Sequence, residues 1–278
     1  MSLDGAHDNC QLPAYPVPYP SAVTYNHGSI IACGGFGEIN AAKCWSYNGN
    51  VWSPLPNTVQ RHCGWSINAP VDGGWWVSGR PQFGRGGACE PKWSSEIFDG
   101  ERWLDGPGLF NQQNDKKTSE GFVCIVNLNS SHSLFVGGSY ASYSTGEWLY
   151  DRNEDKWTET GNLKHKRRNY GCISLGSKGV LVVGGDNQVS GHLYSVELYD
   201  PVTGTWSEQP DRLRTSRPLL LNWNGIPLAL LKDQNNIYQR GDDGVWLELQ
   251  GITLPENFNE HTLDRAILVP DHFVAECM

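Results

Sequence analysis

The sequence predicts an all-β protein built from a repeated four-stranded antiparallel sheet, with the sheets arranged as the blades of a propeller. Three observations predict this fold. Glycine pairs follow β-branched or apolar runs, an aromatic strand followed by one tryptophan recurs about every 50 residues, and turn pairs such as Asn-Gly and Asp-Gly separate the runs. No helical periodicity extends beyond about two turns, so helices are not expected.

The glycine pairs mark the first half of each repeat. Apolar runs end in Gly-Gly at Ile31 to Gly35, Leu134 to Gly138 and Leu181 to Gly185, and a degraded copy lies at Trp75 to Gly79. Runs of this length between turn residues are typical of strands in the interior of a sheet. Because antiparallel sheets of four strands at this spacing stack radially, they leave only short edges and favour a propeller.

The second half of each repeat carries the tryptophan. Aromatic strands at Tyr47, Phe98, Tyr150, Tyr199 and Tyr238 are each followed by a polar turn and one indole. The five tryptophans, 51, 54, 49 and 40 residues apart, are Trp52, Trp103, Trp157, Trp206 and Trp246. A large ring that recurs once per unit is expected to pack between neighbouring blades.

The two chain ends decide the number of blades. Residues 262–276 have the pattern of the first hairpin of a sixth unit, which then stops. Residues 4–12 would supply the missing outer strand or strands. We therefore expect one domain over residues 1–278, a six-bladed propeller closed by both termini; five blades with a terminal hairpin is the alternative.

One stretch carries a resemblance to a known family. Between Arg168 and Trp206 the chain reads Arg-Asn-Tyr-Gly, then Val-Val-Gly-Gly, then Glu-Leu-Tyr-Asp-Pro-Val-Thr-Gly-Thr-Trp. This pattern resembles the kelch repeat, and the resemblance covers residues 20 to about 276. It implies a kelch-type propeller with four antiparallel strands per blade, and a protein-binding role in which arginines at the starts of first strands face the ligand.

Composition narrows the classes of partner. The 21 Lys and Arg against 30 Asp and Glu give a net charge of -9, which argues against a dedicated nucleic-acid binder. No apolar stretch approaches the roughly 20 residues needed to cross a bilayer. The amino terminus lacks the basic and apolar regions of a secretory signal.

The eight cysteines indicate disulfides rather than a metal site, because no Cys-x2-Cys or His-x3-His spacing occurs. Cys33 and Cys44 flank a hairpin that can bring them opposite each other. Cys10 and Cys277 lie at the two ends that meet if the ring closes. Cys124 and Cys172 occupy equivalent places in the first strands of adjacent blades. They either form a bridge or are two small buried thiols, and the sequence favours neither. Cys63 and Cys89 pair only if the intervening glycine-rich loop folds back.

An even cysteine count fits an oxidising compartment, and Asn129-Ser130-Ser131 is a candidate glycosylation acceptor in a turn. The cysteine-bearing chain ends are similar to extracellular kelch domains of invertebrate secreted proteins. This resemblance implies a secreted protein whose signal is absent from the sequence, with a cytoplasmic location as the alternative.

A ligand-binding face is predicted from loop geometry and charge. The connections between blades and the loops after the glycine pairs share one rim, which holds 15 of the 21 basic residues. Guanidinium and ammonium groups there would clamp an acidic peptide segment or an acidic glycan, unless they merely pair with neighbouring acids. The candidate ligand-binding residues are Arg61, Arg80, Arg85, Lys166, Arg167, Arg168, Arg214, Arg217 and Arg265.

Two other classes of function remain as alternatives. Many kelch propellers select substrates for ubiquitin ligases, so the chain could be the substrate-recognition part of an intracellular adaptor. Some related propellers are copper oxidases or sugar mutarotases, but no cluster of His and Tyr and no catalytic motif stands out. We therefore expect a monomeric, non-catalytic binding module with no cofactor, no metal and no membrane insertion.

Overall fold

The computed structural model describes residues 15–16, 22–26, 28–34, 40–62, 67–71, 74–79, 94–106, 124–137, 147–213, 215, 218–223, 225–231 and 236–253. Over these ranges the chain forms strands, apart from one short 3-10 helix at Gly176–Lys178. The strands fall into two compact units, one comprising residues 1–111 with 265–278 and the other residues 112–264. Each unit is described separately below.

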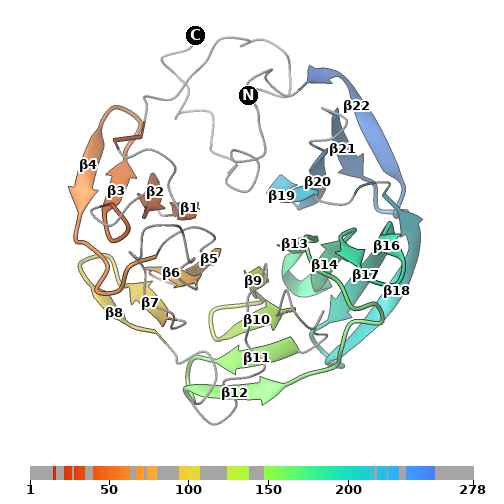
Figure 1. Cartoon of the computed structure of the whole chain (residues 1–278), viewed down its shortest axis with the longest axis horizontal. Coiled ribbons are helices and arrows are strands. Elements are labelled where there is room, and N and C mark those ends of the chain that lie inside the picture. Colours follow the sequence, from red (N-terminus) through yellow and green to blue (C-terminus); the bar gives the residue numbers. More distant parts are fainter. Residues whose placement is uncertain are drawn as a thin grey trace. The chain divides into compact units, whose positions relative to one another are not determined.

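The first unit contains two four-stranded antiparallel sheets. One sheet pairs its strands in chain order: β1 (Ala22–Asn26), β2 (Ser29–Cys33), β3 (Cys44–Tyr47) and β4 (Trp52–Leu55). The next sheet does the same: β5 (Ile67–Val71), β6 (Gly74–Gly79), β7 (Ser94–Phe98) and β8 (Trp103–Asp105). The first strands β1 and β5 are neighbours (Figure 1), which is how successive blades of a propeller meet.

The second unit contains three more sheets of the same design. The first of them contains β9 (Cys124–Asn127), β10 (His132–Val136), β11 (Glu147–Asp151) and β12 (Lys156–Glu159). The second contains β13 (Gly171–Ser174), β14 (Val180–Val183), β17 (Ser195–Asp200) and β18 (Thr205–Arg212). The third contains β19 (Leu219–Trp223), β20 (Ile226–Leu231), β21 (Asn236–Arg240) and β22 (Trp246–Thr253). A separate two-stranded hairpin, β15 (Asp186–Asn187) with β16 (Gly191–His192), is inserted between β14 and β17. The first strand β13 lies between β9 and β19 (Figure 1).

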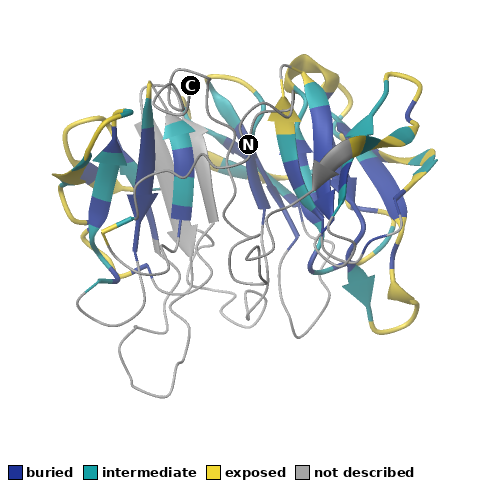
Figure 2. Cartoon of the chain, turned by 90° about the horizontal axis from the view of Figure 1, so that it is seen from above, coloured by how far each residue is buried: buried dark blue, intermediate teal, exposed yellow. Residues whose placement is uncertain are grey.

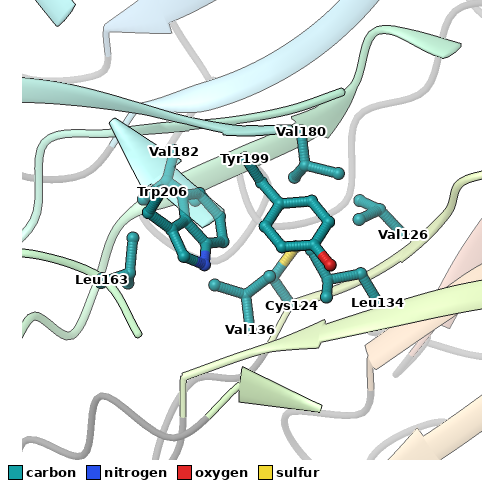
Figure 3. Close-up of a cluster of buried hydrophobic side chains, with 9 residues drawn as sticks. All are labelled: Cys124, Val126, Leu134, Val136, Leu163, Val180, Val182, Tyr199 and Trp206. Carbon is teal, nitrogen blue, oxygen red and sulfur yellow. The ribbon is translucent and has the colours of Figure 1, made fainter. Parts of the chain in front are cut away.

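The core of the second unit lies between successive sheets. Val126, Leu134 and Val136 from one sheet pack against Val180 and Val182 from the next. Figure 3 shows these side chains converging with the rings of Tyr199 in β17 and Trp206 in β18. Alternate residues of a strand point to opposite faces of its sheet. Leu181 and Val183 therefore belong to the following interface, where they meet Leu220 and Leu231. Figure 2 shows that buried residues concentrate in the strands and exposed residues in the turns.

The repeated tryptophans pack as expected at three of the five positions. Trp103 joins residues of the first sheet in one buried cluster, and Trp206 lies in the cluster between the sheets beginning at β9 and β13 (Figure 3). Trp246 packs against the next cluster of the second unit. Trp52 and Trp157 contact the aromatic residue of their own sheet, Tyr47 and Tyr150, with ring centroids 5.3 and 4.8 Å apart. The indoles therefore fill space on the outer strands, largely between neighbouring sheets.

The glycine pair after β14 is required by the backbone. Gly184 and Gly185 have φ values of 67° and 97°, in the left-handed region that side chains disfavour. A Cβ on Gly185 would also lie 2.5 Å from the carbonyl oxygen of Arg168, and one on Gly184 would lie 2.7 Å from that of Thr215. The pair lets the end of the second strand approach both connections that flank its sheet.

The structure confirms the all-β class and the four-stranded repeat. Five four-stranded sheets, rather than the six expected, are found in the described part of the chain. The segments predicted to form the sixth, residues 4–12 and 262–276, lie outside the described residues, so six blades and closure by both termini stay predictions.

Candidate binding rim

The best-described part of the predicted rim is the connection from β12 to β13, residues 160–170 in the second unit. The backbone of this connection is held by one carboxylate, that of Glu197. Glu197, in the third strand β17, accepts hydrogen bonds from the backbone N–H groups of Lys164 at 2.6 Å and His165 at 3.2 Å. The side chain of Glu197 is fully buried, so it fixes the course of the connection above it.

Arg167 completes this arrangement. Its guanidinium lies 2.5 Å from Glu197 and donates further bonds to the carbonyl oxygens of Gly184 and Ser195 and to the Ser195 hydroxyl. Burial lowers the pKa of Arg167, while the charge of Glu197 and its hydrogen bond oppose that shift. The prediction that Arg167 binds ligand is therefore wrong, because its side chain is buried and already saturated by the protein.

The first unit repeats the same arrangement with a histidine in place of the arginine. Glu96 in β7 accepts the backbone N–H groups of Val59 at 2.7 Å and Gln60 at 2.9 Å, and His62 Nε2 lies 2.7 Å from its carboxylate. Both side chains of this pair are fully buried. We call this set a connection clasp: a buried third-strand glutamate, two backbone N–H groups of the incoming connection, and a buried basic side chain three residues after the first of them.

The clasps were missed by the sequence reasoning, although a signal was present. Glu96 stands two residues before Phe98 and Glu197 two residues before Tyr199, and each glutamate is directly followed by an apolar and then an aromatic residue. A carboxylate at the same offset in two repeats indicates a shared structural partner, because unpaired charges are rarely buried.

Arg168 is only partly available to a ligand. Its Nε donates to Asp186 Oδ1 at 2.6 Å, and its side chain is 24% exposed. The two residues also exchange both backbone hydrogen bonds, and Asn169 Nδ2 donates to the second oxygen of Asp186 at 2.6 Å. Asp186 thus ties the connection to the β15–β16 hairpin and neutralises one predicted ligand-binding charge.

Two lysines on the same connection remain open to solvent. Lys164 and Lys166 are exposed, and their ammonium groups form no ion pair with any residue that the structure describes. The nearby acid Glu208 is already engaged by His165 at 3.2 Å and Arg212 at 3.1 Å, and these bonds lower its pKa, the bond from His165 most. The described rim of the second unit therefore has an excess of unpaired positive charge at Lys164 and Lys166.

The remaining predicted rim residues are placed as follows. Arg61 is exposed on the connection from β4 to β5 in the first unit. The other five lie outside the described residues: Arg80, Arg85, Arg214, Arg217 and Arg265. The connections do adjoin the segments after the glycine pairs, as expected, because Thr58 and His62 donate backbone bonds to Ala42 and Ala41.

A second buried carboxyl lies at the start of β11. Glu147 is fully buried and accepts the backbone N–H of Leu163 at 3.2 Å. Burial raises the pKa of Glu147 to about 9, and the nearby charge of Glu197 adds to the rise. Burial also raises the pKa of the adjacent Tyr170, whose hydroxyl donates to the Val136 carbonyl. Glu147 is therefore neutral at physiological pH.

Two of the predicted disulfides are present. Cys33 and Cys44 are directly paired across β2 and β3, with their Cα atoms 4.1 Å apart. Cys124 joins Cys172 across two sheets of the second unit, with Cα atoms 6.3 Å apart. Every described cysteine is bonded. Cys10, Cys63, Cys89 and Cys277 lie outside the described residues, so their pairing stays a prediction.

Cys124 and Cys172, which form the second bridge, are not at equivalent positions of their strands, contrary to the prediction. The strand pairings align Cys124, the partner of Val136, with Gly171, the partner of Val183, so Cys172 is one residue past the equivalent position. A shift of one residue turns a side chain to the other face of its sheet. Cys172 therefore faces back towards Cys124, whereas truly equivalent residues would both point the same way.

Asn129 lies in an exposed turn between β9 and β10, as expected for a glycosylation acceptor. Its Oδ1 accepts the backbone N–H groups of Ser131 and His132, both at 2.8 Å. Arg152 donates to the carbonyl oxygens of Asn129 and Ser130, which fixes the turn further. Attachment of a glycan to Asn129 stays a prediction.

The described ranges hold neither a candidate metal centre nor a candidate membrane-spanning helix. No group of three or more His, Cys, Asp or Glu side chains in these ranges could hold a metal ion. None of the same residues belongs to a helix with the length and hydropathy needed to cross a membrane.

Comparison with known proteins agrees with this geometry. Residues 166–212, which contain the clasp cation Arg167 and the sheet strands β13, β14, β17 and β18, match the kelch motif. The chain is also similar to an F-box/kelch-repeat protein of Arabidopsis thaliana, with 28% identity over 131 residues, 43% of this chain and 33% of the relative. The chain thus spans about a third of that relative's length. The motif, the relative and the four-stranded sheets together support a kelch-type β-propeller.

Proposed function

We propose that this chain is a non-catalytic binding module that recognises an acidic peptide segment or an acidic glycan on the rim formed by its inter-sheet connections. The observation that carries the proposal is the pair of exposed lysines, Lys164 and Lys166, on a connection fixed by the Glu197 clasp. Because the backbone of this connection is already fixed, only the lysine side chains lose conformational entropy when an anion binds.

The neighbouring acids support this polarity. Glu208 and Asp186 are both occupied by cations of the same rim, so neither competes for Lys164 or Lys166. Arg61 extends the basic character in the first unit. The other rim arginines predicted from the sequence would add to it if the ring closes: Arg80, Arg85, Arg214, Arg217 and Arg265. These charges would act on an acidic partner at short range, within about one screening length of the rim.

A charge-reversal experiment tests the proposal. The full chain is titrated by fluorescence anisotropy with two probes, a labelled oligoglutamate peptide and a labelled heparin oligosaccharide. Lys164→Glu with Lys166→Glu should weaken binding of at least one probe by roughly tenfold at low salt, since like charges then face the ligand. The difference should shrink at 1 M salt, where the screening length is about 3 Å.

The matched control reverses two lysines at the opposite ends of the same sheets. Lys156 begins β12 and Lys178 lies between β13 and β14, and both are exposed. Lys156→Glu with Lys178→Glu changes the net charge equally, so it should leave the affinity near that of the wild type. Equal losses in both double variants would mean that only overall charge matters and would refute a rim site.

We also propose an extracellular location, supported by the two disulfides, because such bonds persist in oxidising compartments. Thiol counting on protein isolated from its native source should find Cys33, Cys44, Cys124 and Cys172 blocked. In a secreted protein, peptide-N-glycosidase treatment should also shift the mass through Asn129, and Asn129→Gln should abolish that shift.

A second candidate function is favoured by the plant relative, whose name joins an F-box to kelch repeats. On this alternative the chain reads substrates for a ubiquitin ligase inside the cell, through the same rim. Free thiols at the four described cysteines of the native protein would favour the adaptor and count against the extracellular proposal.

A further inference from the structure

The β15–β16 hairpin is an addition to the four-stranded plan of its sheet. It joins the end of β14 to the start of β17, and no other described sheet has a paired hairpin at this place. Its base is tied to the rim by the paired backbones of Arg168 and Asp186 and by a bond from Asn187 Nδ2 to the Lys166 carbonyl at 3.1 Å. In Figure 2 its two short strands, teal and yellow, lie apart from the dark blue strands of the sheet.

The tip of this hairpin presents an apolar side chain. Asn187 Oδ1 accepts the backbone N–H groups of Val189 at 3.0 Å and Ser190 at 2.7 Å, and Gly191 closes the turn with φ of 66°. Val189 is 95% exposed. A single exposed valine is common on protein surfaces, but this one is held by bonds to Asn187, whose amide is itself bonded to the Lys166 carbonyl.

The cations lie on the connection to which the hairpin is bonded. The carbonyl of Lys166 accepts the hydrogen bond from Asn187 Nδ2, and the Lys166 side chain is exposed. Lys164, two residues earlier, is exposed as well. At the other side of the hairpin, Tyr194 is 38% exposed and its carbonyl accepts the N–H of Leu213. The hairpin thus has an apolar side chain at its tip and a half-exposed aromatic ring beside it. The connection to which it is bonded carries the two exposed lysines.

We propose that the β15–β16 hairpin recognises a protein, through a peptide segment that carries an apolar side chain beside acidic residues. This inference rests on the proposed function and narrows it from two ligand classes to one. Acidic residues of the peptide lie on Lys164 and Lys166, and its apolar side chain covers Val189. A sulfated glycan satisfies the lysines but leaves the valine in water, whereas a peptide removes the apolar surface from water as well.

Peptide selection on the full chain tests the inference. A phage-displayed library of random 12-residue peptides is selected on the immobilised protein, and the enriched sequences are synthesised and titrated. We expect enrichment of peptides with an Asp or Glu run next to Leu, Ile, Val or Phe. Val189→Ser should weaken these peptides by roughly tenfold, the equivalent of burying one valine side chain.

The matched control is another exposed valine. Val202 is 90% exposed in the turn between β17 and β18, at the opposite end of the same sheet. Val202→Ser should bind the selected peptides like the wild type. Both substitutions lie on the surface, so thermal melting should show the fold unchanged in each.

Salt separates the two proposals. The Val189 effect should persist at 1 M salt, whereas the Lys164 and Lys166 effect should fade. Peptides that need the lysines but bind Val189→Ser at full strength would overturn this inference and leave the basic rim intact. Peptides that need Val189 but not the lysines would overturn the proposed acidic ligand instead. Enrichment of no peptide would reject the hairpin as a peptide reader.

Discussion

At the scale of single residues, two neighbouring arginines have different roles. Arg167 and Arg168 are adjacent in sequence, yet one is buried against Glu197 and the other lies at the surface beside Asp186. Alternation of side chains along an extended segment separates them, so a run of basic residues contributes both to the interior and to the rim. Lys164 and Lys166 belong to the exposed set, which is why they rather than Arg167 carry the proposed site.

Breaking the buried pair should be costly. Arg167→Met leaves Glu197 buried without its cation, and removing one partner of such a pair typically destabilises by about 3 to 5 kcal/mol. Urea denaturation followed by tryptophan fluorescence measures the loss. Arg212→Met is the control, because its pair with Glu208 is exposed and should contribute under about 1 kcal/mol. Similar losses for the two variants would show that the clasp does not depend on its charge.

Glu147 should make stability depend on pH. Burial raises the pKa of Glu147 from its ordinary value of 4.5 to about 9 in the folded protein, so the unfolded chain releases this proton at a lower pH. Stability due to this group is complete below the lower value and falls as pH rises between the two, by up to about 1.4 kcal/mol per unit.

The Glu147→Gln variant removes that titration while keeping the shape of the side chain. Its stability relative to the wild type should therefore rise steadily from pH 5 to pH 8.5 in urea titrations. A difference that stays constant over this range would show that Glu147 is ionised in the folded protein.

At the scale of elements, the two disulfides do different work. The Cys33–Cys44 bridge joins paired strands of one sheet that hydrogen bonds already hold, and it closes a separation of 11 residues. The Cys124–Cys172 bridge joins the first strands of two sheets and spans 48 residues. In the chain-entropy account, the larger loop restricts the unfolded chain more.

We therefore expect a larger loss from the second bridge. Cys124→Ala with Cys172→Ala should cost about 4 kcal/mol and Cys33→Ala with Cys44→Ala about 3 kcal/mol, before any change in packing. Chemical denaturation of both double variants under non-reducing conditions compares them. The reverse order would indicate that native packing of the buried Cys33 and Cys44 outweighs the entropy of the unfolded chain.

The element scale also shows how far sequence reasoning extends. The Gly-Gly signals at residues 137–138 and 184–185 and the indoles at 103 and 206 predicted the four-stranded repeat, because backbone strain and ring volume act locally. The facing of Cys124 and Cys172 depended on a one-residue shift between sheets, which spacing in the chain does not reveal. The burial of Arg167 depended on Glu197, 30 residues away, so charge runs alone placed it wrongly on the rim.

At the scale of the whole molecule, the net charge of -9 and the basic rim act together. A protein that is acidic overall repels acidic partners at long range, and locally unpaired lysines must overcome that repulsion at short range. The affinity for an acidic ligand should therefore depend more on which face of the protein the ligand meets than on the net charge of the protein.

Closure of the ring remains a prediction at this scale. Peptide mapping without reduction should recover a fragment in which Cys10 is joined to Cys277, and Cys10→Ser with Cys277→Ser should lower the melting temperature. Recovery of either cysteine as a free thiol, or in a bond with Cys63 or Cys89, would contradict closure through the two termini.

The clasps also bear on how such a chain can be cut and recombined. Glu96 and Glu197 each grip the segment that enters their own sheet, at Val59 to His62 and Lys164 to Arg167. The natural unit of exchange therefore begins at the entering segment and not at the first strand. A chimera joined just before Thr58 or Leu163 would carry each glutamate with its own donors, whereas a junction at Ile67 or Gly171 would strand a buried carboxylate among foreign neighbours.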